Sequence, residues 1–521
     1  SPILRHQIDA GTYTDQDNVL RELVRNAHLS PEERVKITKD AAQIVRDIRG
    51  HTSPGIMEVF LAEYGLSTDE GVALMCLAEA LLRVPDAETI DALIEDKIAP
   101  SDWGRHMGHS TSPLVNASTW ALMLTGRVLD DDQPGPVRHL RAAIKRLGEP
   151  VIRTAVSRAM KEMGRQFVLG ENINAAMERA KGMEKKGYTY SYDMLGEAAR
   201  TESDAKRYHL SYSRAISAIA TACIHKDSRK NPGISVKLSA LHPRYEVAQE
   251  TSVMRDLVPR LRALALLAKS ANMGLNVDAE EADRLGLSLD VIEQVLSEPA
   301  LSGWDGFGIV VQAYGPRAGV VIDALYDMAI RHDRKLMVRL VKGAYWDTEI
   351  KRAQVKGVEG FPVFTQKAAT DVSYIANARK LLNMTDRIYP QFATHNAHTV
   401  AAVLHMADDK AKFEFQRLHG MGETLHNIVM EKHGTHCRVY APVGAHADLL
   451  AYLVRRLLEN GANSSFVNQI VDEDVAPEVV AADPFDSLAE SGMHIPTGPE
   501  LYAPARVNSI GFDLMHTPTL D

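Results

Sequence analysis

Cysteine is scarce in this sequence, with only Cys76, Cys223 and Cys437 among 521 residues. Three scattered thiols are too few for a disulfide framework or a cysteine-rich metal site. Apolar runs approaching the roughly 18 residues of a membrane-spanning helix are missing, and the opening segment SPILRHQIDA lacks the apolar core of a secretory signal. These absences favour a protein of a reducing compartment, so we expect a cytoplasmic location.

An excess of positive charge is also missing. The 59 Lys and Arg residues are outnumbered by 68 Asp and Glu residues, which gives a net charge of -9. Such a chain has no global attraction to nucleic acid, and we predict no nucleic-acid partner for it. Neither G-x-G-x-x-G nor G-x-x-x-x-G-K-[ST] follows an apolar run that reads as a strand, which disfavours a Rossmann or P-loop nucleotide site.

The first third of the chain has helical signals. Ser30-Pro31-Glu32-Glu33 offers a cap, a proline at the first helical position and a glutamate placed to close a capping box. Apolar residues then recur at helical spacing until Gly50, and Ser67-Thr68-Asp69-Glu70 repeats the opening before a second apolar helix. We therefore predict an all-helical region over 1–185, with a loop at 127–138.

Beyond Tyr190 short β-rich runs alternate with helical stretches. Seven runs, marked by valines or phenylalanines between Val236 and Val439, are spaced widely enough for crossover helices, with an insertion after Trp346. Counting SSFVN at 464–468 as the eighth, we predict a distorted (βα)8 barrel over 186–470, with an open doubly wound sheet as the alternative. Residues 471–521 are predicted to form a tail or a connection to a missing domain.

Functional residues of a parallel barrel lie at the carboxyl ends of its strands, and polar residues follow several of these runs. Lys237 alone is compatible with a structural ion pair, a carboxylate ligand or a Schiff-base nucleophile. The adjacent Arg455 and Arg456 alone would be typical of a solvated helix face. His395 and His398 lack a third ligand in the pattern, so we predict no metal site. Cationic and N–H donors for a diphosphate are available from Arg339, Lys342, Gly343-Ala344 and Thr394-His395-Asn396.

Several segments carry a resemblance to a known family. The segments YSYDMLGEAA, GISVKLSALHPRYE, NVDAEEADRL, VRLVKGAYWDTEI, FATHNAHT, EFQRLHGMGE and YLVRRLLENGANSSF closely resemble the proline dehydrogenase domain of the bifunctional bacterial proline utilization A enzymes. The resemblance implies a distorted (βα)8 barrel that binds FAD noncovalently and oxidises L-proline to pyrroline-5-carboxylate, the first step of proline catabolism to glutamate.

The resemblance also implies a substrate site. Lys237, Arg455 and Arg456 would bind the carboxylate of L-proline or of small carboxylate analogues, and charge-assisted bonds suit that anion. Glu197 would support the site by pairing with Arg455. Asp278 would lie beside Tyr440, and Tyr345, Leu418 and Tyr440 would surround the pyrrolidine ring. No residue is identified as a general base.

For the flavin, the resemblance implies hydride transfer from carbon 5 of proline to N5, followed by electron transfer to a membrane quinone and a peripheral association of the parent protein with the inner face of the bacterial inner membrane. Arg339 would tune the flavin electronically, and Trp346 would stack on an adenine. The implied cofactor contacts are Gln312, Arg339, Val341, Lys342, Gly343, Ala344, Trp346, Thr365, Thr394, His395, Asn396 and Glu459.

Two alternatives compete with this flavoenzyme. A barrel lyase or aldolase would use Lys237 as a Schiff-base nucleophile, and a noncatalytic interaction module would use the barrel as a scaffold. Because residue 1 is not methionine and no aldehyde dehydrogenase nucleophile or nucleotide fold is found, we expect the chain to be a fragment of a longer bifunctional enzyme that lacks the second activity.

Overall fold

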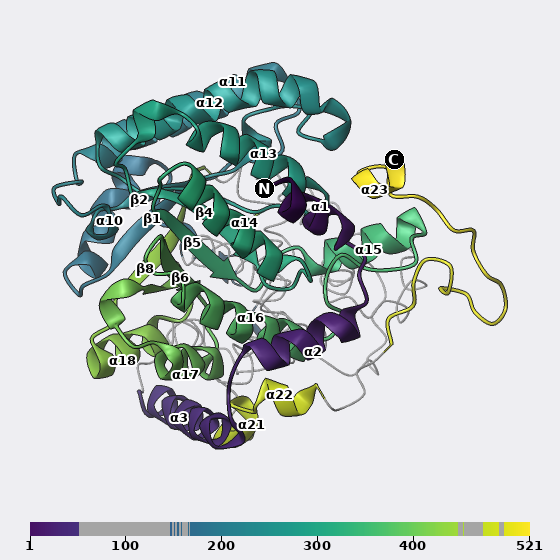
Figure 1. Cartoon of the computed structure of the whole chain (residues 1–521). Helices are drawn as coiled ribbons and strands as arrows, with labels where there is room; N and C mark the ends of the chain where they lie inside the picture. Colours follow the sequence, from purple (N-terminus) through teal and green to yellow (C-terminus); the bar gives the residue numbers. More distant parts are fainter. Residues whose placement is uncertain are drawn as a thin grey trace.

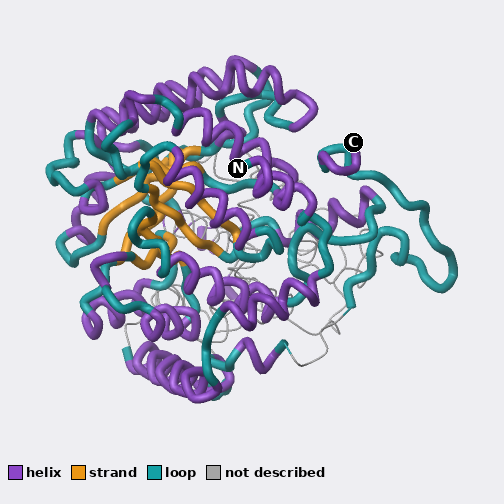
Figure 2. Tube along the Cα trace, in the orientation of Figure 1, coloured by secondary structure: helices purple, strands orange, loops and turns teal. Residues whose placement is uncertain are grey.

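The computed structural model describes residues 1–51, 167–445, 473–488 and 494–521, with residue 452 and scattered residues between 146 and 165. Its centre is a closed barrel in which eight strands follow one another in chain order. All neighbouring strands are parallel, including β1 with β8. The predicted barrel is therefore confirmed, and the open sheet is excluded (Figures 1 and 2).

Seven of the eight strands lie where the sequence predicts them, and one lies in a different part of the chain. They are β1 Thr189–Met194, β2 Gly233–Val236, β3 Leu275–Val277, β4 Phe307–Gln312, β5 Leu336–Val341, β6 Ile388–Ala393, β7 Glu414–Leu418 and β8 Cys437–Val443. The eighth member is therefore β1, ahead of the seven expected runs. Counting 464–468 was wrong, because the barrel closes without it, and that segment lies outside the described residues.

Helices connect the strands and cover the barrel (Figure 1). They are α11 Glu202–Ala220, α12 Glu250–Ser270, α13 Leu285–Leu296, α14 Ala318–Arg331, α15 Trp346–Lys356, α16 Lys367–Leu382, α17 Ala397–Met406 and α18 Glu423–His433. Short 3-10 turns occur at Ser228–Lys230, Leu238–Ala240, Val247–Gln249, Ala282–Arg284, Pro299–Leu301 and Lys410–Lys412. The expected insertion is confirmed, since both α15 and α16 lie between β5 and β6.

A buried ion pair lies at the lower end of the barrel, where the strands begin. Arg438 Nε donates to Glu414 Oε2 at 2.9 Å, and Arg438 Nη1 donates to the carbonyls of Tyr190 and Asn231 at 3.1 and 2.9 Å. The two side chains are only 4% and 2% exposed. This end is opposite to the strand ends that carry the polar residues, so the pair belongs to the scaffold.

The helices of the N-terminal region wrap the barrel. Helix α1 (Pro2–Ala10) packs against α13 and α14, α2 (Gln16–Asn26) against α16, and α3 (Pro31–Gly50) against α17 and α18. The predicted capping box is confirmed, since Glu33 N donates to Ser30 Oγ at 3.2 Å and Ser30 N to Glu33 Oε2 at 2.7 Å. Helix α10 (Ile173–Glu184) leads into β1. The predicted helix after Ser67 and the loop at 127–138 lie outside the described residues.

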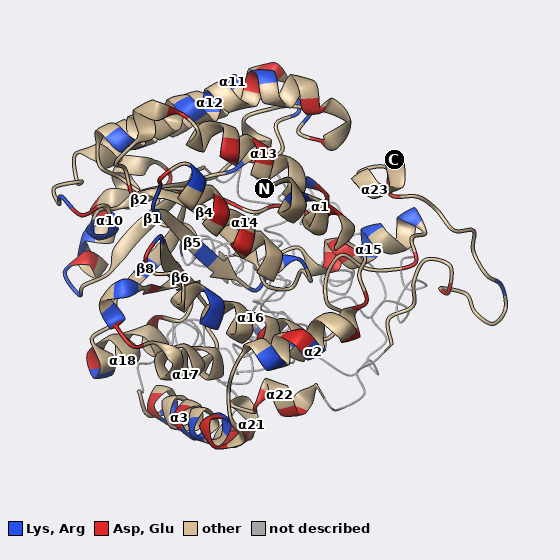
Figure 3. Cartoon of the chain, in the orientation of Figure 1, with Lys and Arg blue, Asp and Glu red and all other residues tan. Residues whose placement is uncertain are grey.

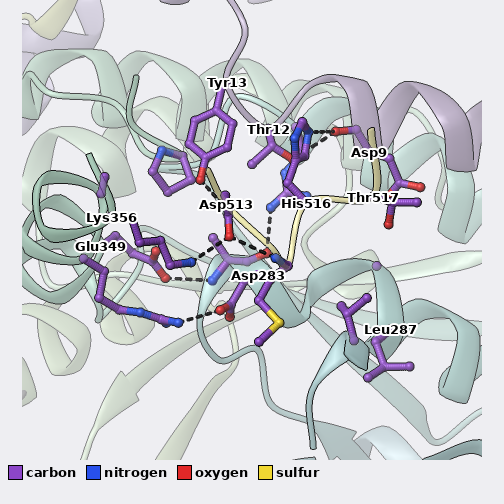
Figure 4. Close-up of a pocket in the computed structure, with 18 of the residues that line it drawn as sticks. Asp9, Thr12, Tyr13, Asp283, Leu287, Glu349, Lys356, Asp513, His516 and Thr517 are labelled. Carbon is purple, nitrogen blue, oxygen red and sulfur yellow. Dashed lines mark hydrogen bonds and ion pairs between the residues drawn. The ribbon is translucent and has the colours of Figure 1, made fainter. Parts of the chain in front are cut away.

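The C-terminal segment returns to the body of the molecule. It contains α21 (Pro477–Val480), α22 (Pro484–Ser487) and α23 (Thr517–Leu520), which contact α3, α16 and α1 respectively. Asp513 connects the C-terminal segment to the loop after α1 and to α15: Tyr13 OH donates to its Oδ2 at 2.5 Å and Lys356 Nζ to its Oδ1 at 2.7 Å. Figure 4 shows these contacts around a cavity of about 60 Å³.

One carboxyl in this cavity predicts a pH-dependent stability. Glu349 on α15 is 4% exposed, and its Oε1 accepts from Ala282 N at 2.7 Å (Figure 4). Burial raises the pKa of Glu349 from 4.5 to about 7, although that N–H bond opposes the shift. The folded state therefore prefers the neutral acid. The resulting stabilisation is complete below about pH 4.5 and is lost as the pH rises towards about 7.

Glu349→Gln is expected to be more stable than the parent by up to about 3 kcal/mol at pH 8 and about equal to it at pH 4.5. The amide stays neutral and its oxygen can still accept from Ala282. Thermal unfolding at the two pH values measures the difference, and the exposed Glu359→Gln serves as the control. An advantage no larger at pH 8 than at pH 4.5 would contradict this account.

Candidate functional site

A cavity of about 290 Å³ opens at the carboxyl ends of the strands. Five residues expected at the substrate line it, namely Lys237, Asp278, Tyr345, Leu418 and Tyr440. Nine of those expected at the flavin line the same cavity: Gln312, Arg339, Val341, Lys342, Gly343, Ala344, Thr394, His395 and Asn396. The structure therefore brings both sets together in one place.

Lys237 directly follows β2 and is the centre of a buried charge network. Its ammonium Nζ donates to Asp193 Oδ1 at 2.9 Å, to Asp278 Oδ2 at 3.0 Å and to Tyr440 OH at 3.1 Å. Tyr440 OH in turn donates to Asp278 Oδ2 at 2.8 Å. All three ammonium protons thus have acceptors, and the side chain is only 6% exposed.

Arg339 on β5 is fixed from four directions. Its Nη1 donates to Asp278 Oδ1 at 3.0 Å and its Nε to Gln416 Oε1 at 2.7 Å. Its Nη2 contacts the hydroxyls of Ser191 and Ser235 at 3.2 and 3.1 Å. A guanidinium held this way keeps one orientation beneath the cavity, which is the preorganisation that an electrostatic role requires.

The network keeps its members in defined charge states. Burial alone lowers the pKa of Lys237, but Asp193 and Asp278 outweigh burial and place it well above its usual value. Burial alone raises the pKa of Asp278, but Lys237 and Arg339 outweigh burial and hold it below its usual value. Two cations and two carboxylates therefore form an electrically balanced cluster. A lysine whose charged form is favoured in this way is a poor amine nucleophile, which disfavours the Schiff-base alternative.

A second set of cations also lines the cavity. Lys342 and Lys367 both pair with Asp371, at 2.7 and 3.2 Å, and both lysines line the cavity. Asn396, the N-cap of α17, lines the same cavity, and its Oδ1 accepts from Thr399 N at 3.1 Å. Lysines beside a helix N-terminus suit a phosphate group.

Some predicted residues lie away from the cavity lining. Trp346 Nε1 donates to the Phe364 carbonyl at 2.8 Å, and its ring packs with the cluster around α15. Thr365 N is bonded to Gln16 Oε1 at 3.3 Å. The pKa of Glu280 is raised mainly by burial, and the nearby Glu197 adds a smaller contribution to this rise. Arg455, Arg456 and Glu459 lie outside the described residues, so their predicted roles remain predictions.

Sequence reasoning missed the residues that hold the network from inside the barrel. These are Asp193 and Ser191 on β1, Ser235 on β2 and Gln416 on β7. Their spacing held a usable signal, because Ser191 and Asp193 alternate with tyrosines in the segment YSYDM. Recognising β1 as a strand would have placed both side chains in the barrel.

Gly343 makes a close approach of the backbone possible. Its φ is +131°, and a Cβ there would lie 2.4 Å from the Tyr314 ring. We expect Gly343→Ala to displace the Lys342–Tyr345 turn and to weaken retention of any cofactor bound in the cavity by tenfold or more, equivalent to about 1–3 kcal/mol of backbone strain. Equilibrium dialysis against FAD measures this. Gly303→Ala provides a control at another positive φ, in open space, and equal retention by both variants would contradict the prediction.

The family model described as "Proline dehydrogenase" matches residues 176–469, more than half of the chain. The chain belongs to the proline dehydrogenase family. Its N-terminal residues 3–49 match the model "Proline utilization A proline dehydrogenase N-terminal domain". The resemblance expected from the motifs is thus confirmed, and the barrel of this family member is the matched region.

The bifunctional relatives are longer than this family member. The "Bifunctional protein PutA" of Salmonella typhimurium is 50% identical over 98% of this chain and 40% of its own length. A solved Bradyrhizobium japonicum proline utilization A variant is 51% identical, with a TM-score of 0.77, over 98% of this chain and 52% of that one. "Proline dehydrogenase 1" of Bacillus subtilis is 28% identical over 58% of this chain and 88% of its length.

One match bears on nucleic acids. Residues 56–167 match a model described as "DNA-binding domain of Proline dehydrogenase". That description is at odds with our prediction of no nucleic-acid partner, and nearly all of these residues lie outside the described ranges. Over the ribbon that is described, acidic and basic residues are interspersed (Figure 3).

Among the described residues, no helix is both long and apolar enough to cross a membrane.

Proposed function

We propose that this chain is an FAD-dependent dehydrogenase that oxidises L-proline to pyrroline-5-carboxylate. The observation that carries the proposal is the joining, in one cavity, of the Lys237–Asp278–Tyr440–Arg339 network with a phosphate-compatible lining. The family supports the reaction class, and the cavity supports both a small carboxylate and a flavin nucleotide. The scaffold alternative offers no reason for this arrangement.

The residues present fit a noncovalent FAD. Val310, Val341 and Ala393 give the cavity apolar walls, while Gln312 and Arg339 offer polar groups for the edge of a flavin ring. Lys342, Lys367 and the N-terminal end of α17 would bind the diphosphate. When bound, FAD would supply the hydride acceptor, N5, for carbon 5 of proline. Trp346, Thr365 and Glu459 are retained as proposed contacts.

The substrate carboxylate is proposed to bind at Lys237, completed by Arg455 and Arg456, with Glu197 orienting Arg455. Asp278 stays ionised at neutral pH because Lys237 and Arg339 lower its pKa. It therefore keeps Tyr440 and Arg339 in place while Tyr345, Leu418 and Tyr440 exclude water from the ring. The chain's contribution is positioning and charge.

The wider setting is also proposed from the family. Electrons would pass to a membrane quinone, and the protein would be cytoplasmic with peripheral membrane association. The division into a helical region at 1–185, a barrel at 186–470 and a connection at 471–521 remains our proposed domain assignment.

The absorption spectrum of the purified protein tests the cofactor directly. We expect a flavin spectrum, or its appearance on adding FAD, and release of the flavin on denaturation as expected for noncovalent binding. Borohydride treatment with a carbonyl substrate should leave Lys237 unmodified. A colourless protein that cannot take up FAD, with borohydride trapping at Lys237, would replace the proposal by the lyase.

A further inference from the structure

Asp193 lies below the cavity, in the interior of the barrel. The residue is fully buried, with 0% exposure, and it is not part of the cavity lining. Its Oδ1 accepts from Lys237 Nζ at 2.9 Å, whereas its Oδ2 is buried without a hydrogen-bond partner in the described structure. A buried carboxylate in such a place destabilises the fold unless a cation pairs with it.

The two carboxylates around Lys237 have different partners. Asp278 also accepts from Arg339 at 3.0 Å and from Tyr440 at 2.8 Å, so its charge is balanced without Lys237. Among the described residues, Asp193 has one cationic partner within 4 Å, which is Lys237. The charges of the cluster therefore divide into two pairs, Arg339 with Asp278 and Lys237 with Asp193.

The same contacts divide into exchangeable and permanent ones. Asp278 and Tyr440 line the cavity and are already bonded to each other. An incoming carboxylate can therefore take their places on the Lys237 ammonium without leaving either of them without a partner. Asp193 is out of reach of the cavity and must keep its bond. One ammonium proton thus anchors Lys237 while the other two are free to exchange.

We propose that Asp193 is the positioning residue that keeps Lys237 charged and aimed into the cavity, so that Lys237 can bind the carboxylate of the substrate. This inference rests on the proposed function for the identity of the substrate. Among the described residues, the titratable groups facing the ammonium are Asp193, Asp278, Tyr440 and Tyr212, with Arg339 behind Asp278. The high pKa of Lys237 agrees with this geometry.

Binding of cyclopentanecarboxylate to the holoenzyme tests the proposal without turnover, because this ring carboxylate lacks the amine. Calorimetric titration of the parent is expected to give the same affinity from about pH 7 to about pH 10, because Lys237 stays protonated over that range. Asp193→Asn should bind about tenfold to a hundredfold more weakly. Its affinity should also fall within that pH range as Lys237 loses its proton. Equal affinity with no new pH dependence would overturn the proposal.

Asp513→Asn is the matched control. It too neutralises a buried carboxylate in an ion pair with a lysine, here Lys356, but away from the cavity lining, and it should leave the affinity and its pH profile unchanged. A loss of binding in this variant equal to that in Asp193→Asn would assign the effect to general destabilisation and overturn the proposal.

Lys237→Met separates this inference from the proposed function. If Lys237→Met binds cyclopentanecarboxylate as well as the parent, the substrate role of Lys237 fails, and the inference fails with it. If Lys237→Met is weakened but Asp193→Asn is not, only the inference fails. The double variant, which combines Asp193→Asn with Lys237→Met, should bind no more weakly than Lys237→Met alone, because Asp193 acts through the lysine.

The double variant also covers a failure of Asp193→Asn to fold. Folding of the double variant with the affinity of Lys237→Met would show that Asp193 is needed to balance the lysine, as proposed. A double variant that is unfolded as well would show that Asp193 serves the barrel independently of Lys237 and would overturn the inference.

Discussion

Lys237→Met is expected to lower kcat/KM for L-proline by about 10²- to 10³-fold. Truncating one partner of a buried charge pair in a binding site costs upwards of about 2 kcal/mol, here about 3–4 kcal/mol, and each 1.36 kcal/mol is a factor of ten in rate. Here the lost ammonium contacts two carboxylates at 2.9 and 3.0 Å and, as proposed, the substrate carboxylate. Steady-state kinetics with an artificial electron acceptor measures the loss.

The loss should be mostly in KM, because the ammonium is proposed to bind the same carboxylate in the ground state and in the transition state. Lys335→Met, an exposed lysine at the lower end of β5, is the control and should retain the parental kcat/KM. Parental kcat/KM in a folded Lys237→Met variant would exclude Lys237 from substrate binding.

Arg339→Met is expected to lower the reduction potential of the FAD that we propose for this cavity by about 30–60 mV. A charge-assisted hydrogen bond contributes about 1.5–3 kcal/mol, and 1.4 kcal/mol corresponds to about 30 mV for a two-electron couple. The cation favours the electron-rich reduced state, so its removal makes reduction harder. Spectroelectrochemical titration measures the potential.

Arg339→Lys is the informative companion variant. It keeps the charge but cannot satisfy Asp278, Gln416 and the two serines together, as the guanidinium does. We expect its potential to lie between those of the parent and Arg339→Met. A potential unchanged in Arg339→Met would show that Arg339 acts only on the scaffold.

The barrel could be predicted from the sequence because seven β-rich runs alternate with helical stretches at spacings that fit crossover helices. The missed strand, β1, alternates between aromatic and polar residues: Tyr190 and Tyr192 are buried, and Ser191 and Asp193 between them contact Arg339 and Lys237 inside the barrel. Parallel strands are normally apolar on both faces. A strand with a polar inner face breaks that pattern, and the last run of the chain was counted in its place.

The site could be predicted only in part for a related reason. Lys237, Asp278 and Arg339 are recognisable because they end or interrupt apolar strands and match family motifs. Their supporting residues are defined by partners far along the chain: Asp193 lies 44 residues from Lys237, and Gln416 lies 77 residues from Arg339. Spacing cannot reveal such pairs, since they meet only when the barrel closes.

Anaerobic mixing of the FAD-loaded protein with L-proline tests the central claim most directly. We predict loss of the visible flavin absorbance in a single turnover, slowed when carbon 5 of proline carries deuterium because that C–H bond breaks during reduction. A flavin that stays oxidised with saturating L-proline would contradict the assignment of this cavity as a proline-oxidising site.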